Sequence, residues 1–226
     1  MARRQFAVIG LGRFGSAMAR TLADLGQDVI GVDADSEKVR QLADTIAQAV
    51  ELDATDERAL RAVGVQDVDV AVVSIGENIE SSVLVVMQLR ELGVKSIVAK
   101  ATTPLHGRIL EKLGVSRVIF PEREMAMRIA HGLVMPNVID YIELSSDLSV
   151  VELPAPEPFV GRTLKQLELR PKYGLTLIAI KRRSAGGDKD VTNVAPSADE
   201  VIRAGDVLSL LGSSERLAAL DAMLKR

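Results

Sequence analysis

The sequence has no cysteine and no tryptophan, and only 3% of its 226 residues are aromatic. Without cysteine the chain forms no disulfide, no thiolate metal site and no thiol nucleophile, and this absence fits a reducing compartment. Histidine and tyrosine are scarce as well, with two of each. Few side chains are therefore available as a general acid or base.

Long apolar runs are also lacking, although the mean hydropathy is +0.18. None approaches the roughly 18 to 20 residues that a membrane-spanning helix needs. Arg13 and nearby glycines interrupt the first apolar stretch too early for a signal peptide. The net charge of −3 argues against a nucleic-acid partner. With 47% hydrophobic and 26% charged residues, we expect a soluble, cytoplasmic protein of one large or two modest domains.

Two kinds of segment alternate through the first 120 residues. Short apolar runs without helical spacing predict strands at 5–10, 28–35, 67–76, 95–101 and 116–120, and a short strand followed by a loop at 47–56. Segments with helical character predict helices at 14–25, 37–47, 57–64, 78–93 and 103–114. Six such strands alternating with helices indicate a parallel sheet covered on both faces, which is the doubly wound α/β class.

A glycine motif, G-x-G-x-x-G, follows the first expected strand and opens the first expected helix at Gly10, Gly12 and Gly15. The first glycine permits a tight turn, the second lets a phosphate approach the backbone, and the third lets helix and strand pack closely. The start of the helix offers free N–H groups and a positive dipole end to the phosphate. Asp33, at the end of the second strand, can accept hydrogen bonds from ribose hydroxyls. We therefore predict a nucleotide site; the alternative is a glycine turn that serves packing alone.

The class of nucleotide follows only in part from these residues. Asp33 disfavours a 2′-phosphate and so NADP, but it does not separate NAD from ATP or ADP. Arg13 lies beside the expected phosphate path, where it either pairs with a terminal phosphate, in its own subunit or a neighbour's, or is merely solvated. Thr55 and Asn78 have helix capping as an alternative role. The predicted nucleotide-binding residues are Gly10, Gly12, Arg13, Phe14, Gly15, Asp33, Asp35, Asp53, Ala54, Thr55, Ser74, Ile75, Gly76 and Lys100.

Hydride transfer would need a proton donor or acceptor near the substrate carbonyl. Neither Tyr141 nor Tyr173 has a lysine four residues further on, and we expect His106 and His131 to be structural or solvated. The prediction is a nucleotide-binding protein that is not an enzyme, with an NAD-dependent oxidoreductase as an alternative.

A helix with apolar residues at Met125, Ile129 and Leu133 is predicted after residue 120, ending before Pro136. Its methionine stripe is interpreted as a packing surface between domains or between subunits. Glu122 and Glu124 stand at the start of this helix, where the helix dipole stabilises their carboxylates. The alternative is that they contribute to a metal site near a bound phosphate.

Three prolines within residues 154–158 mark the entry into a smaller unit. Strands are expected at 150–153, 175–182 and 206–212, helices at 163–169 and 214–224, and a hairpin-like loop at 181–190. Such a small unit has a marginal core, so we expect it to pair with a copy of itself.

Several segments together resemble the RCK family, which regulates potassium channels and transporters. They are FAVIGLGRFGSAMARTLADLGQDVIGVDAD, ELDATD, VVSIGENIESS, RVIFPEREMAMRIA, LELRPKYGLTLIAIKR and AGDVLSLLG. The likeness is greatest to the cytosolic regulatory subunits of bacterial Ktr potassium-uptake systems, which are related to Trk-type regulators. It implies a Rossmann-like RCK N-domain at 1–140 and a smaller α+β RCK C-domain at 141–226.

The resemblance also implies ligands and partners. Family members bind ATP or ADP, with ATP favouring the active and ADP the inactive ring; NAD or NADH is the alternative, as in Trk-type relatives. Homodimers assemble into octameric rings that act on a KtrB-like membrane potassium-transporter subunit, which would hold the protein at the inner face of the cell membrane. Arg13 would reach the ATP terminal phosphate across the dimer, and Glu122 would bind Mg²⁺ or another cation. Arg170 and Pro196 would belong to a second site, for cyclic di-AMP.

Overall fold

The computed structural model describes residues 3–76, 78–135, 137–145, 147–183 and 190–224. The chain divides into two compact units, Met1–Pro121 and Glu122–Arg226. The domain boundary predicted between residues 140 and 141 lies beyond the helix that opens the second unit.

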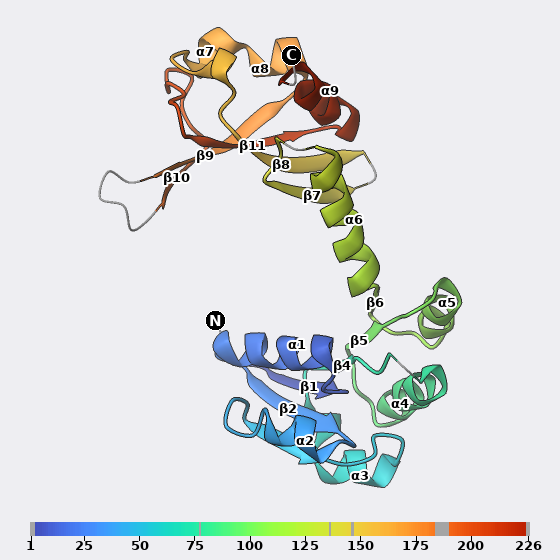
Figure 1. Ribbon diagram of the computed structural model, residues 1–226. Helices are drawn as coiled ribbons and strands as arrows, with labels where there is room; N and C mark the ends of the chain where they lie inside the picture. Colours follow the sequence, from blue (N-terminus) through green and yellow to red (C-terminus); the bar gives the residue numbers. More distant parts are fainter. Residues whose placement is uncertain (1–2, 77, 136, 146, 184–189, 225–226) are drawn as a thin grey trace. The chain divides into compact units, whose positions relative to one another are not determined.

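The first unit contains a six-stranded parallel sheet in the order β3-β2-β1-β4-β5-β6 (Figure 1). Its strands are β1 Gln5–Ile9, β2 Asp28–Asp33, β3 Gln48–Glu51, β4 Val70–Val73, β5 Ile97–Lys100 and β6 Arg117–Ile119. Its helices are α1 Arg13–Asp24, α2 Ser36–Arg40, α3 Glu57–Ala62, the short η1 Val65–Asp67, α4 Ile79–Glu91 and α5 Pro104–Lys112. The predicted doubly wound α/β fold is confirmed.

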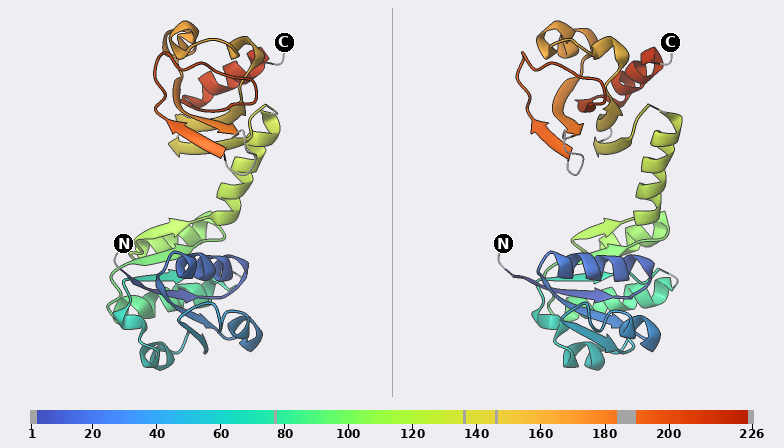
Figure 2. Two further views of the ribbon diagram at one scale, coloured as in Figure 1. Left: turned by 90° about the vertical axis from the view of Figure 1, so that its left-hand side faces the viewer. Right: turned by 60° about the vertical axis from the view of Figure 1, so that its left-hand side comes forward.

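Alternate residues of each strand point to opposite faces of the sheet, so this unit has two apolar cores. On one face Val8 of β1 packs with Ala19 of α1 and Val39 of α2. On the other face Ile9 belongs to the core that includes Leu60 of α3, Val85 of α4 and Leu110 of α5. Both views in Figure 2 show α1 (blue) lying along β1. Helices on both faces leave the carboxyl ends of the strands as the place where a ligand binds in such folds.

Helix α2 is shorter than predicted, because it ends at Arg40 instead of residue 47. Turns replace the helix from Gln41 onward, and the Gln41 carbonyl accepts a hydrogen bond of 2.7 Å from Arg20. These turns bring Ile46 against Gly31 of β2, where its Cδ1 lies 2.6 Å from the position of a Cβ built on that glycine. Contact with a distant strand therefore overrides the helical pattern of the segment.

The second unit contains a five-stranded antiparallel sheet in the order β10-β9-β11-β8-β7. Its strands are β7 Asp140–Ser145, β8 Leu148–Pro154, β9 Thr176–Arg183, β10 Asp190–Val194 and β11 Val207–Gly212. Its helices are α6 Pro121–Val134, the short η2 Glu157–Phe159, α7 Leu164–Leu167, α8 Leu169–Tyr173 and α9 Ser214–Leu224. The smaller α+β unit is thus confirmed, with two edge strands, β7 and β10, that the sequence did not predict.

The helix predicted at 163–169 corresponds to α7, and a second short helix that was not predicted, α8, follows it. Glu168 has a φ of +48°, a left-handed conformation that ends α7 and precedes α8. The tip of the hairpin-like loop, residues 184–189, lies outside the described residues, but β9 and β10 pair on either side of it.

Helix α6 has no buried residue among those described, and its apolar side chains are exposed. Met125, Ile129 and Leu133 keep 51%, 54% and 78% of their surface exposed. The helix is joined to β7 by Arg128, whose Nε donates to Asp140 at 2.9 Å and lowers the pKa of that carboxyl. The apolar stripe is thus present on the surface of the described helix, and its role as a packing surface stays a prediction.

Candidate nucleotide-binding site

The three glycines of the motif occupy three different environments where β1 leads into α1: Gly10 and Gly12 precede the helix, and Gly15 lies in its first turn. Gly10 has a φ of +92°, which favours glycine, and its N–H donates to the Val32 carbonyl at 2.8 Å. A Cβ on Gly15 would lie 1.9 Å from the Gly10 carbonyl oxygen, whereas a Cβ on Gly12 would meet no atom within 4 Å. Gly10 and Gly15 are therefore needed by the turn itself, and Gly12 leaves the backbone open on its outer side.

The start of α1 faces this open side. Gly12 is the N-cap residue and has no side chain to cap the helix, and the N–H of Ser16 makes the first helical bond, to the Gly12 carbonyl, at 2.9 Å. The preceding N–H groups of a helix have no partner within it, and Arg13 and Phe14 carry two of them. Arg13 is exposed and Phe14 half-buried. This arrangement suits an anion such as a phosphate.

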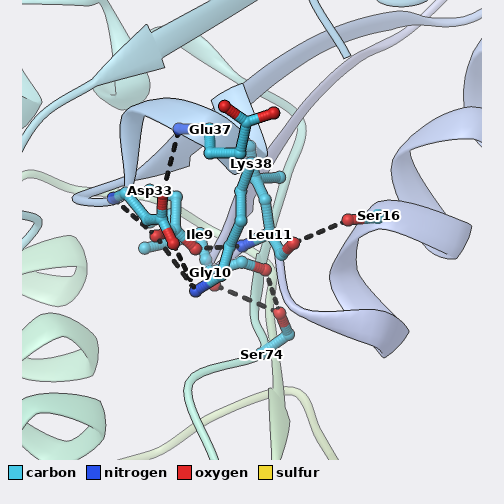
Figure 3. A network of polar contacts seen from close by, with 9 residues as sticks. Ile9, Gly10, Leu11, Ser16, Asp33, Glu37, Lys38 and Ser74 are labelled. Carbon is cyan, nitrogen blue, oxygen red and sulfur yellow. Dashed lines mark hydrogen bonds and ion pairs between the residues drawn. The ribbon is translucent and has the colours of Figure 1, made fainter. Parts of the chain in front are cut away.

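Asp33 ends β2 and is fixed by the loops on either side (Figure 3). Its Oδ2 accepts a hydrogen bond from the Leu11 N–H at 2.7 Å, and its Oδ1 accepts one from the Asp35 N–H at 2.9 Å. Asp35 in turn caps α2 by accepting from the Glu37 N–H. The carboxylate that was predicted to bind ribose is thus held beside the glycine loop.

Lys38, which the sequence analysis did not single out, approaches the same carboxylate. Its Nζ lies 3.6 Å from Asp33 Oδ1 and 3.7 Å from Asp35 Oδ2. Figure 3 shows the lysine side chain extending to the Asp33 carboxylate at the edge of the glycine loop. The sequence carried one signal for this contact, which is a basic residue in the first turn of the helix that follows the expected ribose-binding acid.

The ends of β4 and β5 complete the site from the other side of β1. The Ser74 hydroxyl donates a short hydrogen bond to the Gly10 carbonyl, and the Ile75 N lies 3.1 Å from the position of a Gly10 Cβ. A Cβ on Gly76 would lie 3.5 Å from the Lys100 Nζ. The structure therefore brings these predicted residues together around the glycine turn.

The loop after β3 lies beside Asp33, because the Leu52 N–H donates to the Asp33 carbonyl at 3.1 Å. Within it Asp53 accepts hydrogen bonds from the hydroxyl and the N–H of Thr55, which lower the pKa of the Asp53 carboxyl. Gln88 of α4 donates to the Thr55 carbonyl at 2.6 Å and so holds the loop from behind. Ala54, between them, is buried.

The two capping alternatives have different outcomes. Asn78 does cap α4, by accepting from the Ser81 N–H at 3.0 Å. The cap of α3 is Asp56, which accepts from the Arg58 N–H at 2.9 Å, and the capping role considered for Thr55 is therefore wrong.

The predicted cation and second-ligand residues lie in the other compact unit. Glu122 is exposed in the first turn of α6. No three histidine, aspartate or glutamate side chains gather into a metal site anywhere in the described part of the chain. Arg170 is exposed in α8, and Pro196 follows Ala195, whose φ is +54°.

Both histidines have structural surroundings. His106 is 1% exposed, and burial lowers its pKa. Its Nδ1 accepts a hydrogen bond from the Thr102 N–H at 3.4 Å. His131 stacks on Tyr141 with ring centroids 4.2 Å apart.

Comparison with known proteins gives two family matches. The TrkA-N domain model matches residues 6–121 and the TrkA-C domain model matches residues 148–225. The chain is 44% identical over 211 residues to Ktr system potassium uptake protein C of Bacillus subtilis, covering 93% of each chain. It is 38% identical over 218 residues to Ktr system potassium uptake protein A of the same organism, covering 96% of each.

Solved structures show the same fold. The RCK domain of GsuK has a TM-score of 0.65 at 20% identity, over 100% of this chain and 48% of that one. The GsuK channel bound to NAD has a TM-score of 0.64 at 19% identity, over 99% of this chain and 40% of that one. In the described residues, no helix combines the length and the apolar character needed to cross a bilayer.

Proposed function

The chain belongs to the TrkA-N/TrkA-C family of Ktr and Trk potassium-uptake regulatory subunits, and from this premise we propose that it is a nucleotide sensor that gates a potassium transporter. The observation that carries the proposal is the glycine turn with Asp33 fixed beside it. The turn exposes backbone N–H groups to a phosphate, and the carboxylate lies where a ribose would follow. ATP and ADP are the proposed ligands.

The switch would depend on the different affinities of two conformations for the two nucleotides. Shifting a population from 1:99 to 99:1 requires about 5.5 kcal/mol of differential binding, which eight coupled sites could share at under about 1 kcal/mol each. Arg13 is exposed at the first position of α1, beside the open phosphate side of the loop. Its guanidinium would pair with the third phosphate of ATP, which ADP lacks, and thereby supply the difference.

The assembly we propose is a homodimer that forms an octameric ring and acts on a KtrB-like membrane subunit at the inner face of the cell membrane. Exposed apolar residues along α6 support an interface between copies, because large apolar side chains rarely line one exposed helix without a partner. Two B. subtilis relatives are potassium-uptake proteins by name, which supports the transport role.

Two further ligands belong to the proposal. Glu122 would contribute to binding Mg²⁺ or another cation that accompanies the ATP phosphates, since carboxylates are common ligands of such ions. Arg170 and Pro196 would line a cyclic di-AMP site in the second unit.

A regulator that reads NAD or NADH is the second candidate, and one observation favours it: the structurally similar GsuK channel is described as bound to NAD. Asp33 accommodates the ribose of either nucleotide. An oxidoreductase is disfavoured, because His106 is buried with a lowered pKa and His131 is stacked on Tyr141.

Calorimetric titration of the nucleotide-free protein with ATP, ADP, NAD and NADH, each with and without Mg²⁺, tests the proposal. We expect binding of ATP and ADP, with Mg²⁺ affecting ATP more strongly. Selective binding of NAD or NADH would replace the proposal by the second candidate, and a failure of all four ligands to bind would refute nucleotide sensing.

Replacing Arg13 by alanine tests the origin of the discrimination. A lost charge-assisted bond corresponds to about 1.5–3 kcal/mol, so ATP should bind roughly 10- to 150-fold more weakly, while ADP changes little. Lys112→Ala is the matched control, because it removes one positive charge from the carboxyl end of α5, the helix that leads into the edge strand β6. Equal losses for ATP and ADP in Arg13→Ala would contradict the role given to Arg13.

A further inference from the structure

We propose that Lys38 is a specificity-determining residue that competes with the ribose hydroxyls for Asp33, and so sets how strongly the site depends on a free ribose diol. The inference rests on the proposed nucleotide binding. It concerns the same site but a residue and an effect that the glycine motif does not predict.

The Asp33 carboxylate has too few free acceptor positions to serve its present partners and two ribose hydroxyls without competition. A carboxylate has two oxygens with about four lone-pair positions. Among the described residues, the Leu11 N–H takes one position on Oδ2, the Asp35 N–H takes one on Oδ1, and the Lys38 ammonium faces Oδ1 at 3.6 Å. A ribose diol needs two acceptors, one for each hydroxyl. Two positions, one on each oxygen, are therefore left for the two hydroxyls, and the Lys38 ammonium, at an ion-pair distance, faces the oxygen whose remaining position one hydroxyl needs.

Lys38 has a second ion-pair partner, Asp35, which can bind its ammonium when a ribose occupies Asp33. Its Nζ lies 3.7 Å from Asp35 Oδ2, which is about as far as from Asp33. The side chains differ in exposure: Asp33 is 12% exposed, Lys38 43% and Asp35 49%. Binding would move the ammonium from the more buried carboxylate to the more exposed one, a small motion of a flexible side chain.

The same cluster bears on the ribose substituent. Two carboxylates and one ammonium leave a net negative charge beside the ribose position. The two carboxylates offset the positive charge of Lys38, so the lysine does not attract a 2′-phosphate to this position. The ligand class that fits is a nucleotide with both ribose hydroxyls free.

The measurement is the affinity ratio between ATP and 2′,3′-dideoxy-ATP, obtained by calorimetric titration of the full-length protein and its variants. Both ligands have the same phosphates, so any attraction of Lys38 for phosphate cancels in the ratio. What remains is the contribution of the hydroxyls, which is where the competition acts.

Three variants should change this affinity ratio in different directions. Lys38→Met removes the competitor and should raise the preference for ATP over the dideoxy analogue about two- to fivefold, the range set by a partly exposed ion pair. Asp35→Asn keeps the cap of α2, since asparagine is an equally good N-cap, but leaves the lysine to Asp33 alone and should lower the preference. Arg40→Met, which removes a cation paired with Glu37 on the same helix, should leave the ratio unchanged.

The outcomes separate this inference from the proposed function. An unchanged ratio in Lys38→Met, with both affinities shifted together, would mean that the lysine acts on phosphate, and a lowered ratio would mean that it holds the ribose; either overturns the competition. Equal binding of the two ligands by the unaltered protein would overturn it too, while leaving nucleotide binding intact. If the unaltered protein binds neither ligand, both the proposed function and this inference fail. Thermal unfolding of each variant confirms that the titrated protein is folded.

Discussion

Alanine at Gly15 should lower the stability of the fold, whereas alanine at Gly12 should leave stability nearly unchanged and weaken nucleotide binding, although the two glycines belong to one motif. A Cβ on Gly15 would lie 1.9 Å from the Gly10 carbonyl oxygen and 2.5 Å from the Ser74 hydroxyl oxygen, so the loop or the helix must move. Overpacking of this kind costs about 1–3 kcal/mol or more, and here the atom in the way is backbone, which does not rotate aside. We expect a loss of at least about 3 kcal/mol in the free energy of unfolding.

Gly12 is different, because its φ of −66° suits any residue and a Cβ there would meet no atom within 4 Å. Alanine should change the free energy of unfolding by no more than about 0.5 kcal/mol, as for other substitutions that touch nothing. The new methyl group would stand where the phosphate approaches. Losing one charge-assisted bond from the backbone costs about 1.5–3 kcal/mol, so ATP and ADP should both bind roughly 10- to 150-fold more weakly.

Urea unfolding and calorimetric titration of the two variants and the unaltered protein check both numbers. If Gly12→Ala binds ADP as well as the unaltered protein does, the outer side of the loop is not a phosphate site. A Gly15→Ala variant of normal stability would show instead that the glycine turn tolerates displacement, and that its packing role is overstated.

Two further predictions concern stability. Burial alone would raise the pKa of Asp206, but hydrogen bonds from Arg182 and from the Arg203 N–H outweigh it and lower the pKa. A lowered folded-state pKa contributes stability above the unfolded value of about 3.9, which is lost as the pH falls through the folded value. Asp206→Asn should therefore cost about 1.5–3 kcal/mol at pH 7 in urea unfolding, and the cost should shrink as the pH falls below the unfolded pKa; a constant difference would contradict this. Gly107→Ala would place a Cβ 2.6 Å from the Phe120 ring and should lower the unfolding free energy by about 1–3 kcal/mol. Adding Phe120→Leu should recover part of that loss, and strict additivity would rule out the contact as its cause.

Much of the first unit could be predicted because its local patterns agree with its tertiary contacts. The inner strands of the parallel sheet are largely apolar on both faces, the helices have caps or glycine ends, and the glycine spacing follows directly from the turn it forms. The second unit was harder, since β7 and β10 are edge strands whose exposed residues carry little apolar pattern. The break at Glu168 had no sequence signal either, because a left-handed glutamate is uncommon.

The sequence by itself determined the alternation of strands and helices, the three glycines of the turn, and the acid at the end of the second strand. Each of these is a local requirement, set by side-chain periodicity or by the backbone conformation of a few residues. Tertiary structure decided where α2 ends, which carboxylate Lys38 faces, and how Ser74 supports Gly10. Those outcomes depend on packing between residues far apart in the chain or on the path of a loop, and neither is encoded in the spacing of residues along a segment.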